Sequence, residues 1–248
     1  MLNYGVYGRG RYWEVDLLRG IGIAMMIVSN AVTDLQFFLG YSHHWLFWRA
    51  FAITTASIFI FTSGLSFWIS YSRTLRRNPR PYGKYMMRAL KLVGLGLLIT
   101  LVTLSFPTGT IYFGILTFLG VSTLLGIPFY RLEEKNLLIA PLFLLGWFLI
   151  RNLDGPSWLL PIGVIPDFFM LDYFPIFPWF SLYLAGIGVG SLFYPGGKRR
   201  RELKTPRFPL VPLICFAGRH SLIIYLVHQP IIVGFLLLIY GHLPGLPI

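Results

Sequence analysis

Long apolar runs alternate with short polar segments along the whole chain. A helix that crosses the hydrocarbon core of a bilayer needs roughly 20 apolar residues. Seven runs are candidates, at 17–39, 47–71, 90–106, 112–130, 137–150, 176–193 and 221–240. The fifth is short, so we expect it to be tilted or extended by its neighbours. The pattern predicts an all-α integral membrane protein, a polytopic helical bundle of about seven transmembrane helices.

One further apolar stretch, Trp158 to Leu171, is interrupted by Pro161, Gly163 and Pro166. Irregular backbone at membrane depth is tolerated where protein or a water-filled cavity surrounds it. This stretch is therefore a candidate re-entrant or interfacial segment, which would bring the elements to eight. The chain shows neither an internal repeat nor a separate soluble domain, so we expect residues 1–248 to form one transmembrane domain.

Composition supports the membrane assignment. Hydrophobic residues make up 56% of the chain and charged residues 12%, with a mean hydropathy of +0.68, whereas soluble domains are about 25% charged. The net charge of +12 would suggest nucleic acid in a soluble protein, but no nucleic-acid-binding motif accompanies it. We expect a lipid bilayer as partner and no nucleic acid.

The positive charges also predict orientation. Seven spans place four segments on one side of the membrane, and the other side holds only Arg49 and Arg151. Lys and Arg gather in cytoplasmic loops, which predicts a multi-pass protein of the cell (plasma) membrane with a cytoplasmic N-terminus and an external C-terminus. No small-residue cleavage site follows the first run, so we expect a retained first span. The cations on the expected cytoplasmic side are Arg9, Arg11, Arg73, Arg76, Arg77, Arg80, Lys84, Arg88, Arg131, Lys135, Lys198, Arg199, Arg200, Arg201, Lys204, Arg207 and Arg219.

Strongly polar side chains within spans are costly and often functional. In the first span Asp16 and Arg19 share a helix face, where a local ion pair is the simpler interpretation. Asn30 lies roughly 20 Å of helical rise beyond Leu17, and Asp34 follows on the same face. Hydrogen bonding between helices would also explain these two residues.

Two histidines, His43 and His44, follow in the expected outer loop. Histidine titrates near neutral pH and commonly serves as a general base, although two solvated surface histidines are an equally simple explanation. The last span carries a polar stripe of Ser221, Tyr225 and His228. Polar groups on two spans favour a polar cavity inside the bundle.

Other residues predict architecture. Cys215 cannot form an internal disulfide and lacks metal-ligand spacing, so we expect no metal. Gly186 and Gly190 have the small-xxx-small spacing of closely packed membrane helices and suggest a homodimer.

Six blocks, in order, resemble one family. RYWEVDLLRGIGIAMMIVSN (11–30) resembles the opening motif of the heparan-α-glucosaminide N-acetyltransferase catalytic-domain family, prokaryotic branch, within the transmembrane acyltransferases. The wider group usually has His where this chain has Asn30. Similar blocks are FIFTSGLSFWIS (59–70), KYMMRALKLVGLGLL (84–98), GILTFLGVS (114–122, with Thr117 where Gln is usual), DYFPIFPWFSLYLAGIGVG (172–190) and GRHSLIIYLVHQP (218–230).

The resemblance implies transfer of an acetyl group from the co-substrate acetyl-CoA to a sugar or amino-sugar acceptor. It implies Asn30 and either His43 or His44 as catalytic residues; spacing from Gly64 favours His43. The expected CoA-binding residues are Arg11, Asp16, Arg19, Ser63, Lys84 and Arg88. The expected acceptor-binding residues are Asp34, Asp172, Trp179, Ser221 and His228.

Two alternatives remain at this stage. A transporter or flippase of a small polar solute would also need polar groups within the membrane. A non-catalytic scaffold would lack affinity for a cofactor. The acceptor, the choice between N- and O-acetylation, and the choice between direct transfer and an acetyl-histidine intermediate stay open.

Overall fold

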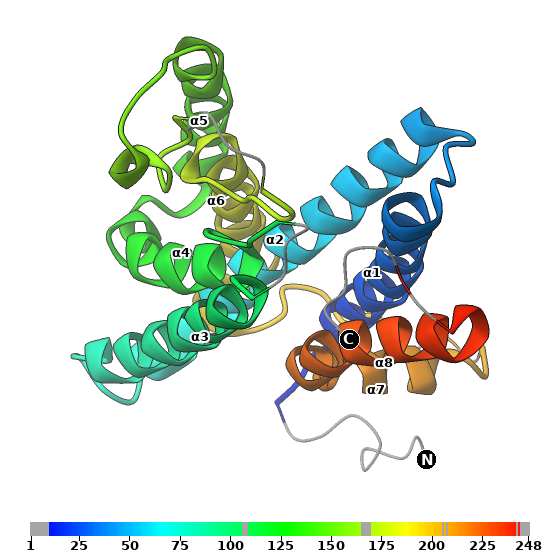
Figure 1. Cartoon of the computed structure of the whole chain (residues 1–248). Helices are drawn as coiled ribbons and strands as arrows, with labels where there is room; N and C mark the ends of the chain where they lie inside the picture. Colours follow the sequence, from blue (N-terminus) through cyan, green and yellow to red (C-terminus); the bar gives the residue numbers. More distant parts are fainter. Residues whose placement is uncertain are drawn as a thin grey trace. The chain divides into compact units, whose positions relative to one another are not determined.

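The computed structural model describes residues 10–105, 109–164, 170–204, 206, 208–241 and 243. Arg9, Pro166 and Arg207, named above, lie outside these residues. The described part is helical, with two isolated β-bridges and no strand (Figure 1). The helices are α1 (Trp13–Leu39), α2 (Trp45–Leu75), α3 (Tyr82–Thr103), α4 (Ile115–Phe129), α5 (Asn136–Ile150), α6 (Ile176–Phe193), α7 (Val211–Arg219) and α8 (Ser221–Tyr240), with 3₁₀ turns η1 (Tyr130–Lys135), η2 (Ser157–Leu159) and η3 (Pro195–Gly197).

The prediction of an all-α membrane bundle is confirmed. Each predicted span coincides with a helix, and six helical stretches in the described residues are long and apolar enough to cross a membrane. One of the six, Ile115–Ile150, contains both α4 and α5. The short helix α7 was not predicted, because it lies in a segment expected to be a cytoplasmic loop. In the segment Trp158–Leu171, the described residues contribute to the turn η2 and form a β-bridge from Met170 to Thr110, and they form no α-helix.

The chain divides into two compact units. Of the described residues, those from 10 to 62 and from 203 to 243 form the terminal unit, and those from 63 to 202 form the central unit. The division falls within α2, so the first half of this helix belongs to the terminal unit and the second half to the central unit.

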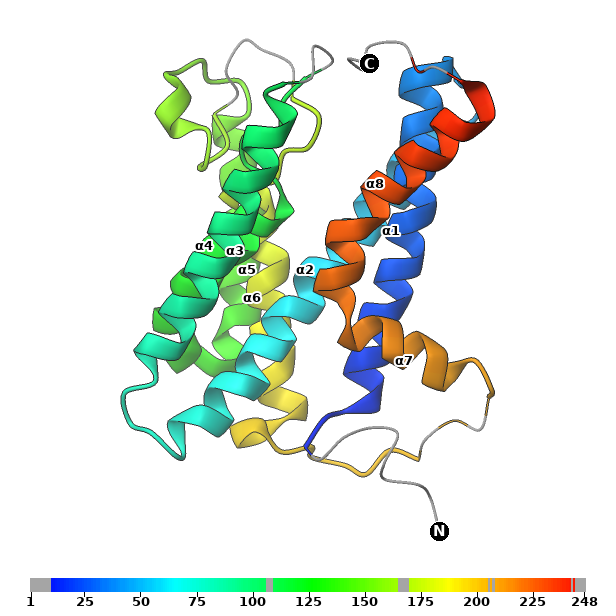
Figure 2. The same cartoon turned by 60° about the horizontal axis from the view of Figure 1, so that its bottom comes forward.

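Glycines bring the helices of the terminal unit together. A Cβ atom on Gly20 would meet the carbonyl oxygen of Ile214, and one on Gly218 would meet that of Asp16. Helix α7 therefore lies directly against the start of α1, as Figure 2 also shows. Helix α1 ends at Gly40, whose left-handed φ of 68° turns the chain and lets its N–H bond to the Leu35 carbonyl. A residue with a Cβ adopts this φ at a cost.

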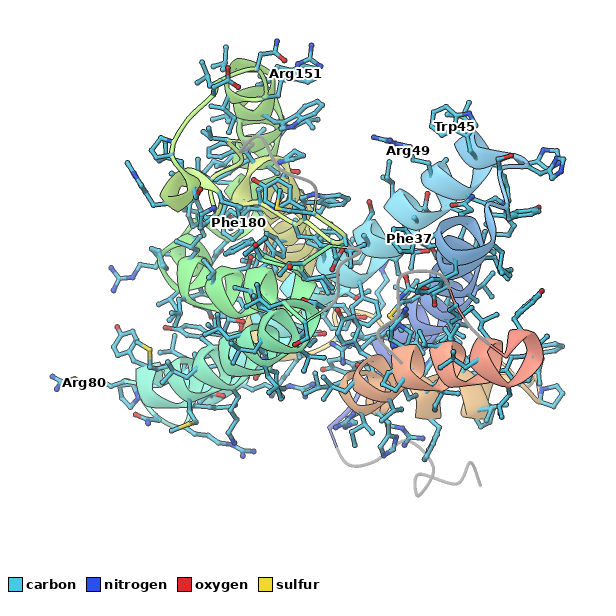
Figure 3. The ribbon with its side chains drawn as sticks, in the orientation of Figure 1. Phe37, Trp45, Arg49, Arg80, Arg151 and Phe180 are labelled. Atoms are coloured by element: carbon cyan, nitrogen blue, oxygen red, sulfur yellow. The ribbon has the colours of Figure 1, made fainter. Side chains whose placement is uncertain are left out.

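The central unit packs by the same principle. Gly64 on α2 lies against the Tyr183 carbonyl of α6, and Gly190 on α6 lies against the Trp68 ring of α2. The predicted close-packing face of α6 is thus occupied by a helix of the same chain. Its core includes the fully buried rings of Phe67, Tyr183 and Phe180, the last labelled in Figure 3.

Helices α4 and α5 are joined by η1, and α4 packs mainly on α3 whereas α5 packs on α6. Glu133, in η1 between them, has φ 47° and ψ −126°, which is not helical. At the far end, the start of α4 lies beside Asp172, and Ile150, the last residue of α5, lies beside Gly163. The chain therefore reverses at η1, and the 36-residue apolar stretch is two helices of 15 residues each.

The central unit has a basic end and a loop end. At one end, the basic end, the Arg73 guanidinium donates to the Gly197 carbonyl at 2.8 Å and Tyr130 donates to the Ser72 hydroxyl at 3.1 Å. At the other, the loop end, bridges join Thr110 to Met170 and Phe113 to Tyr173. Arg80 and Arg151 mark the two ends in Figure 3.

Candidate functional site

A polar pair joins α1 to α8 within the terminal unit. Nδ2 of Asn30 lies 2.6 Å from Nε2 of His228, and Nδ1 of His228 lies 2.5 Å from the Tyr225 carbonyl oxygen. Because a carbonyl can only accept, Nδ1 carries the ring proton. In the neutral imidazole Nε2 is then the acceptor, which matches the Asn30 amide as donor. His228 is held as one tautomer with its basic nitrogen directed at Asn30.

A second pair extends this polar contact. Gln229 donates from Nε2 to both carboxylate oxygens of Asp34, at 2.9 Å each. Asp34 lies one turn beyond Asn30, and both Asp34 and His228 are buried. Ser221, at the start of α8, is seven residues before His228. The first and last spans thus meet at a polar interface formed by Asn30, His228, Asp34 and Gln229.

The outer histidines lie farther along α1. Nine residues of helix separate Asn30 from Leu39, a rise of about 14 Å, and His43 and His44 follow in an exposed turn. His43 lines an open pocket of about 400 Å³ together with the end of α1 and Tyr240 of α8. His44 has a positive φ of 55°. The structure therefore pairs Asn30 with His228. It places His43 in the pocket beside the end of α1, in the same unit.

Cations gather at the other end of the terminal unit. Arg11 forms an ion pair with Asp16 at 3.8 Å, and Arg19 and Arg219 both interact electrostatically with the same carboxylate. The expected pair of Asp16 with Arg19 is therefore part of a larger cluster, which includes Arg219 from α7. Glu14 also acts on this carboxylate, so the cluster carries three positive charges and two negative charges. Its excess positive charge suits an anionic ligand.

The remaining CoA-binding candidates belong to the central unit. Lys84 donates to Thr74 at 2.7 Å and to Ser70 at 3.3 Å, and its ammonium lies 5.2 Å from the centre of the Tyr85 ring. Arg88 is one turn farther along α3 and is exposed, whereas Ser63 is buried within α2. Lys84 and Arg88 thus present their charges at the basic end.

The acceptor-binding candidates Asp172 and Trp179 lie at the loop end. The Asp172 carboxylate accepts a hydrogen bond from the backbone N–H of Ile115 at the start of α4, and burial raises its pKa to about 6. Trp179 contacts the ring of Phe174, with ring centroids 4.9 Å apart. Tyr173 donates to the Leu160 carbonyl at 2.7 Å. The loop before α6 is thus bonded to the start of α4 through Asp172 and to the loop after α5 through Tyr173.

Two residues in these clusters were not selected from the sequence, Gln229 and Arg219. Gln229 adjoins His228 in the last motif, so its position within a polar stripe could have indicated it. Arg219 is the last residue of α7, a helix that was not predicted, and no local pattern placed it beside Asp16. Within the described ranges no group of three or more His, Cys, Asp or Glu residues could hold a metal ion.

The comparison with protein families gives one match. The family described as "Heparan-alpha-glucosaminide N-acetyltransferase, catalytic" matches residues 11–230. No curated protein and no solved structure was found to match the chain. The matched range begins at the Arg11 cluster and ends at Pro230, directly after His228 and Gln229, so it includes every candidate residue described above.

Proposed function

Because this chain belongs to the heparan-alpha-glucosaminide N-acetyltransferase catalytic family, we propose that it is a membrane acetyltransferase that uses cytosolic acetyl-CoA to acetylate an amino sugar or glycan at the non-cytoplasmic face. The observation that carries the proposal is the 2.6 Å contact between Asn30 and a single tautomer of His228. It places a base and an amide donor together within an apolar helical unit. These are the two groups that acyl transfer from a thioester requires.

The chemistry follows from those two side chains. The amine or hydroxyl of the acceptor attacks the acetyl carbonyl carbon. The Asn30 amide turns from Nε2 of His228 to the carbonyl oxygen, and the freed Nε2 removes the proton from the attacking atom. The Asn30 amide N–H groups stabilise the negative charge on the carbonyl oxygen. The C–S bond then breaks, and the CoA thiolate leaves with the proton from His228. The Tyr225 carbonyl, which accepts from Nδ1, orients the ring and stabilises the imidazolium.

The two ends of the terminal unit fit the two substrates. The Arg11, Arg19 and Arg219 cluster offers positive charge to the phosphates of CoA at the end expected to be cytoplasmic. The pocket beside His43 opens at the other end of α1, where a glycan would arrive. In this arrangement His43 and His44 receive the acceptor, and their predicted role as the catalytic base is the alternative to His228.

Acetyl transfer by purified protein tests the proposal, with radiolabelled acetyl-CoA and a panel of amino sugars. We expect His228→Gln and Asn30→Leu each to reduce transfer at least about 100-fold while acetyl-CoA still binds. His220→Gln, an exposed histidine directly before α8, is the matched control and should transfer normally. Loss of transfer in a His43→Ala, His44→Ala double variant, with His228→Gln active, would instead assign the base to the outer turn.

Binding separates the proposal from its alternatives. A transporter or a scaffold predicts no saturable binding of acetyl-CoA. An acetyltransferase predicts saturable binding that weakens in Arg19→Ala, because a phosphate contact is lost. If the wild-type protein binds no acetyl-CoA, acetyl transfer is rejected.

A further inference from the structure

Helix α7 is too short to cross a membrane, and it has two apolar faces. Its nine residues rise about 14 Å, less than half of a hydrocarbon core of about 30 Å. Val211, Cys215 and Gly218 recur every three to four residues and form the buried face. Leu213 and Phe216 lie on the other face and are 65% and 52% exposed. Only the first face is therefore covered by the described part of the chain.

The exposed apolar face continues into the residues before the helix. Phe208 and Leu210 are 59% and 50% exposed. Together with Leu213 and Phe216 they form an exposed apolar surface, which we call the α7 surface. Phenylalanine and leucine side chains of this kind anchor helices that lie in the plane of a membrane interface.

Contacts with α1 show how far along the first span α7 lies. Gly218 lies against the Asp16 carbonyl, and Gly20 lies against the Ile214 carbonyl, so α7 crosses the first two turns of α1 (Figure 2). Asp16 and Arg19, in these turns, are charged groups that favour the polar interface over the hydrocarbon core. The α7 surface is therefore at interface depth, where an amphipathic helix buries its apolar face between headgroups and acyl chains.

The sequence around α7 carries almost only positive charge. Residues 198–220 contain seven Lys or Arg residues and one acidic residue, Glu202, and no acidic residue follows Glu202 in the chain. Arg219 acts on the Asp16 carboxylate, so it is engaged within the protein. The exposed cations before α7 are Lys198, Arg200, Arg201 and Lys204.

Cations gather on the cytoplasmic side of membrane proteins in general, but here they directly precede an exposed apolar surface at interface depth. This combination is typical of segments that bind anionic lipids. We propose that the α7 surface and the cations before it bind anionic phospholipids of the adjoining leaflet. Leu213 and Phe216 enter the acyl region, and the cations contact lipid phosphates.

A second copy of this chain fits the α7 surface less well. In a two-fold contact the same surface is used by both copies, so the cations before each α7 would face one another. A purely zwitterionic lipid surface would cover the apolar side chains and leave the positive charge without a counterion. The inference is independent of acetyl transfer, because it concerns the lipid around the protein with or without a co-substrate.

Fluorescence quenching by lipid at one labelled position tests the proposal. The full chain with Leu213→Cys carries an environment-sensitive fluorophore on the new thiol, since Cys215 is buried. Vesicles of phosphatidylcholine contain brominated phosphatidylglycerol or brominated phosphatidylcholine at the same mole fraction, and the bromine atoms quench on contact. We expect the anionic lipid to quench at least about threefold more strongly, and high salt to bring the ratio of the two quenching constants towards one.

A charge variant and a matched control show which cations matter. Arg200→Gln, Arg201→Gln, Lys204→Gln, made together on the labelled chain, should bring the ratio to about one. The control Arg76→Gln, Arg77→Gln, Arg80→Gln removes three exposed cations from the turn between α2 and α3 and should leave the ratio unchanged.

Three results would overturn the proposal. Equal quenching by the two lipids on the unsubstituted charge background would show that the α7 surface meets lipid without preference for anionic headgroups. Quenching by neither lipid would show that protein covers the surface, a second copy included. The same fall of the ratio in both triple variants would assign the preference to the overall charge of the protein and not to the cations before α7.

Discussion

Gln229 donates one side-chain amide to both carboxylate oxygens of Asp34, at 2.9 Å each, across the two helices that begin and end the predicted bundle. Asp34 is 7% exposed, so these bonds replace most of its contact with water. A buried carboxylate that loses its donors is destabilising. The pair therefore stabilises the contact between α1 and α8, in addition to placing polar groups there.

Removal of this donor should lower stability. We expect Gln229→Ala to reduce the free energy of unfolding by about 1–3 kcal/mol, seen as a lower melting temperature in detergent. The double variant Asp34→Leu, Gln229→Leu should recover part of the loss, because neither polar group is then left without a partner. A double-mutant cycle with no coupling energy would show that the two side chains do not interact.

The contact between α1 and α7 depends on a residue without a side chain. A Cβ on Gly218 would meet the Asp16 carbonyl oxygen, so Gly218→Ala must push backbone apart. We expect a loss of about 1–3 kcal/mol in the free energy of unfolding. Gly234→Ala is the control, since nothing lies within 4 Å of a Cβ there, and the gain in helix propensity should make that variant slightly more stable. Equal melting temperatures for the two variants would contradict the close approach.

Stability should depend on pH through Asp172. Burial raises the pKa of this carboxyl from 3.8 to about 6, so the folded protein holds its proton more tightly than the unfolded chain. The resulting stabilisation is complete below pH 3.8 and is lost as pH rises through about 6. We expect the wild-type melting temperature to fall between pH 5 and pH 7.

Asp172→Asn removes the titration and keeps an acceptor for the Ile115 N–H. Its melting temperature should change less than that of the wild type over the same pH range. A pH profile identical to that of the wild type would assign the dependence to another group.

Topology can be tested with single cysteines. Cys215 is buried and burial raises the pKa of its thiol to about 11, so the native protein should react poorly with maleimide. On that background, we expect a membrane-impermeant maleimide to label Trp158→Cys in intact cells and Arg77→Cys only after permeabilisation. Both positions are exposed. Labelling of Arg77→Cys from outside would reverse the predicted orientation.

Apolar periodicity and turn residues predicted most of the helices, because a membrane span is a local property of the sequence. The bounds of α6 and α8 agree with the predicted runs to the residue. Helix α7 was missed since its nine residues are too few to span a bilayer and it lies between basic residues. Its role depends on contacts with α1, far away in the sequence.

The sequence predicted which residues belong to the candidate site, but it did not predict which of them are in contact. Asn30 and His228 were both selected as polar residues within spans, yet 198 positions separate them. The sequence placed Asn30 near the histidines that follow it, because proximity along the chain was the available guide. Which helices of a bundle touch is decided by close approaches such as Gly20 on Ile214, and these depend on the fold.

The turn at Glu133 has a mechanical consequence for the lipid. It leaves α4 and α5 with 15 residues each, a rise of about 22 Å against a hydrocarbon layer of about 30 Å. A bilayer accommodates apolar helices that are too short by thinning around them. The membrane should therefore be thinnest beside α4 and α5, and the distance that a polar group must travel between the two aqueous faces is shortest there.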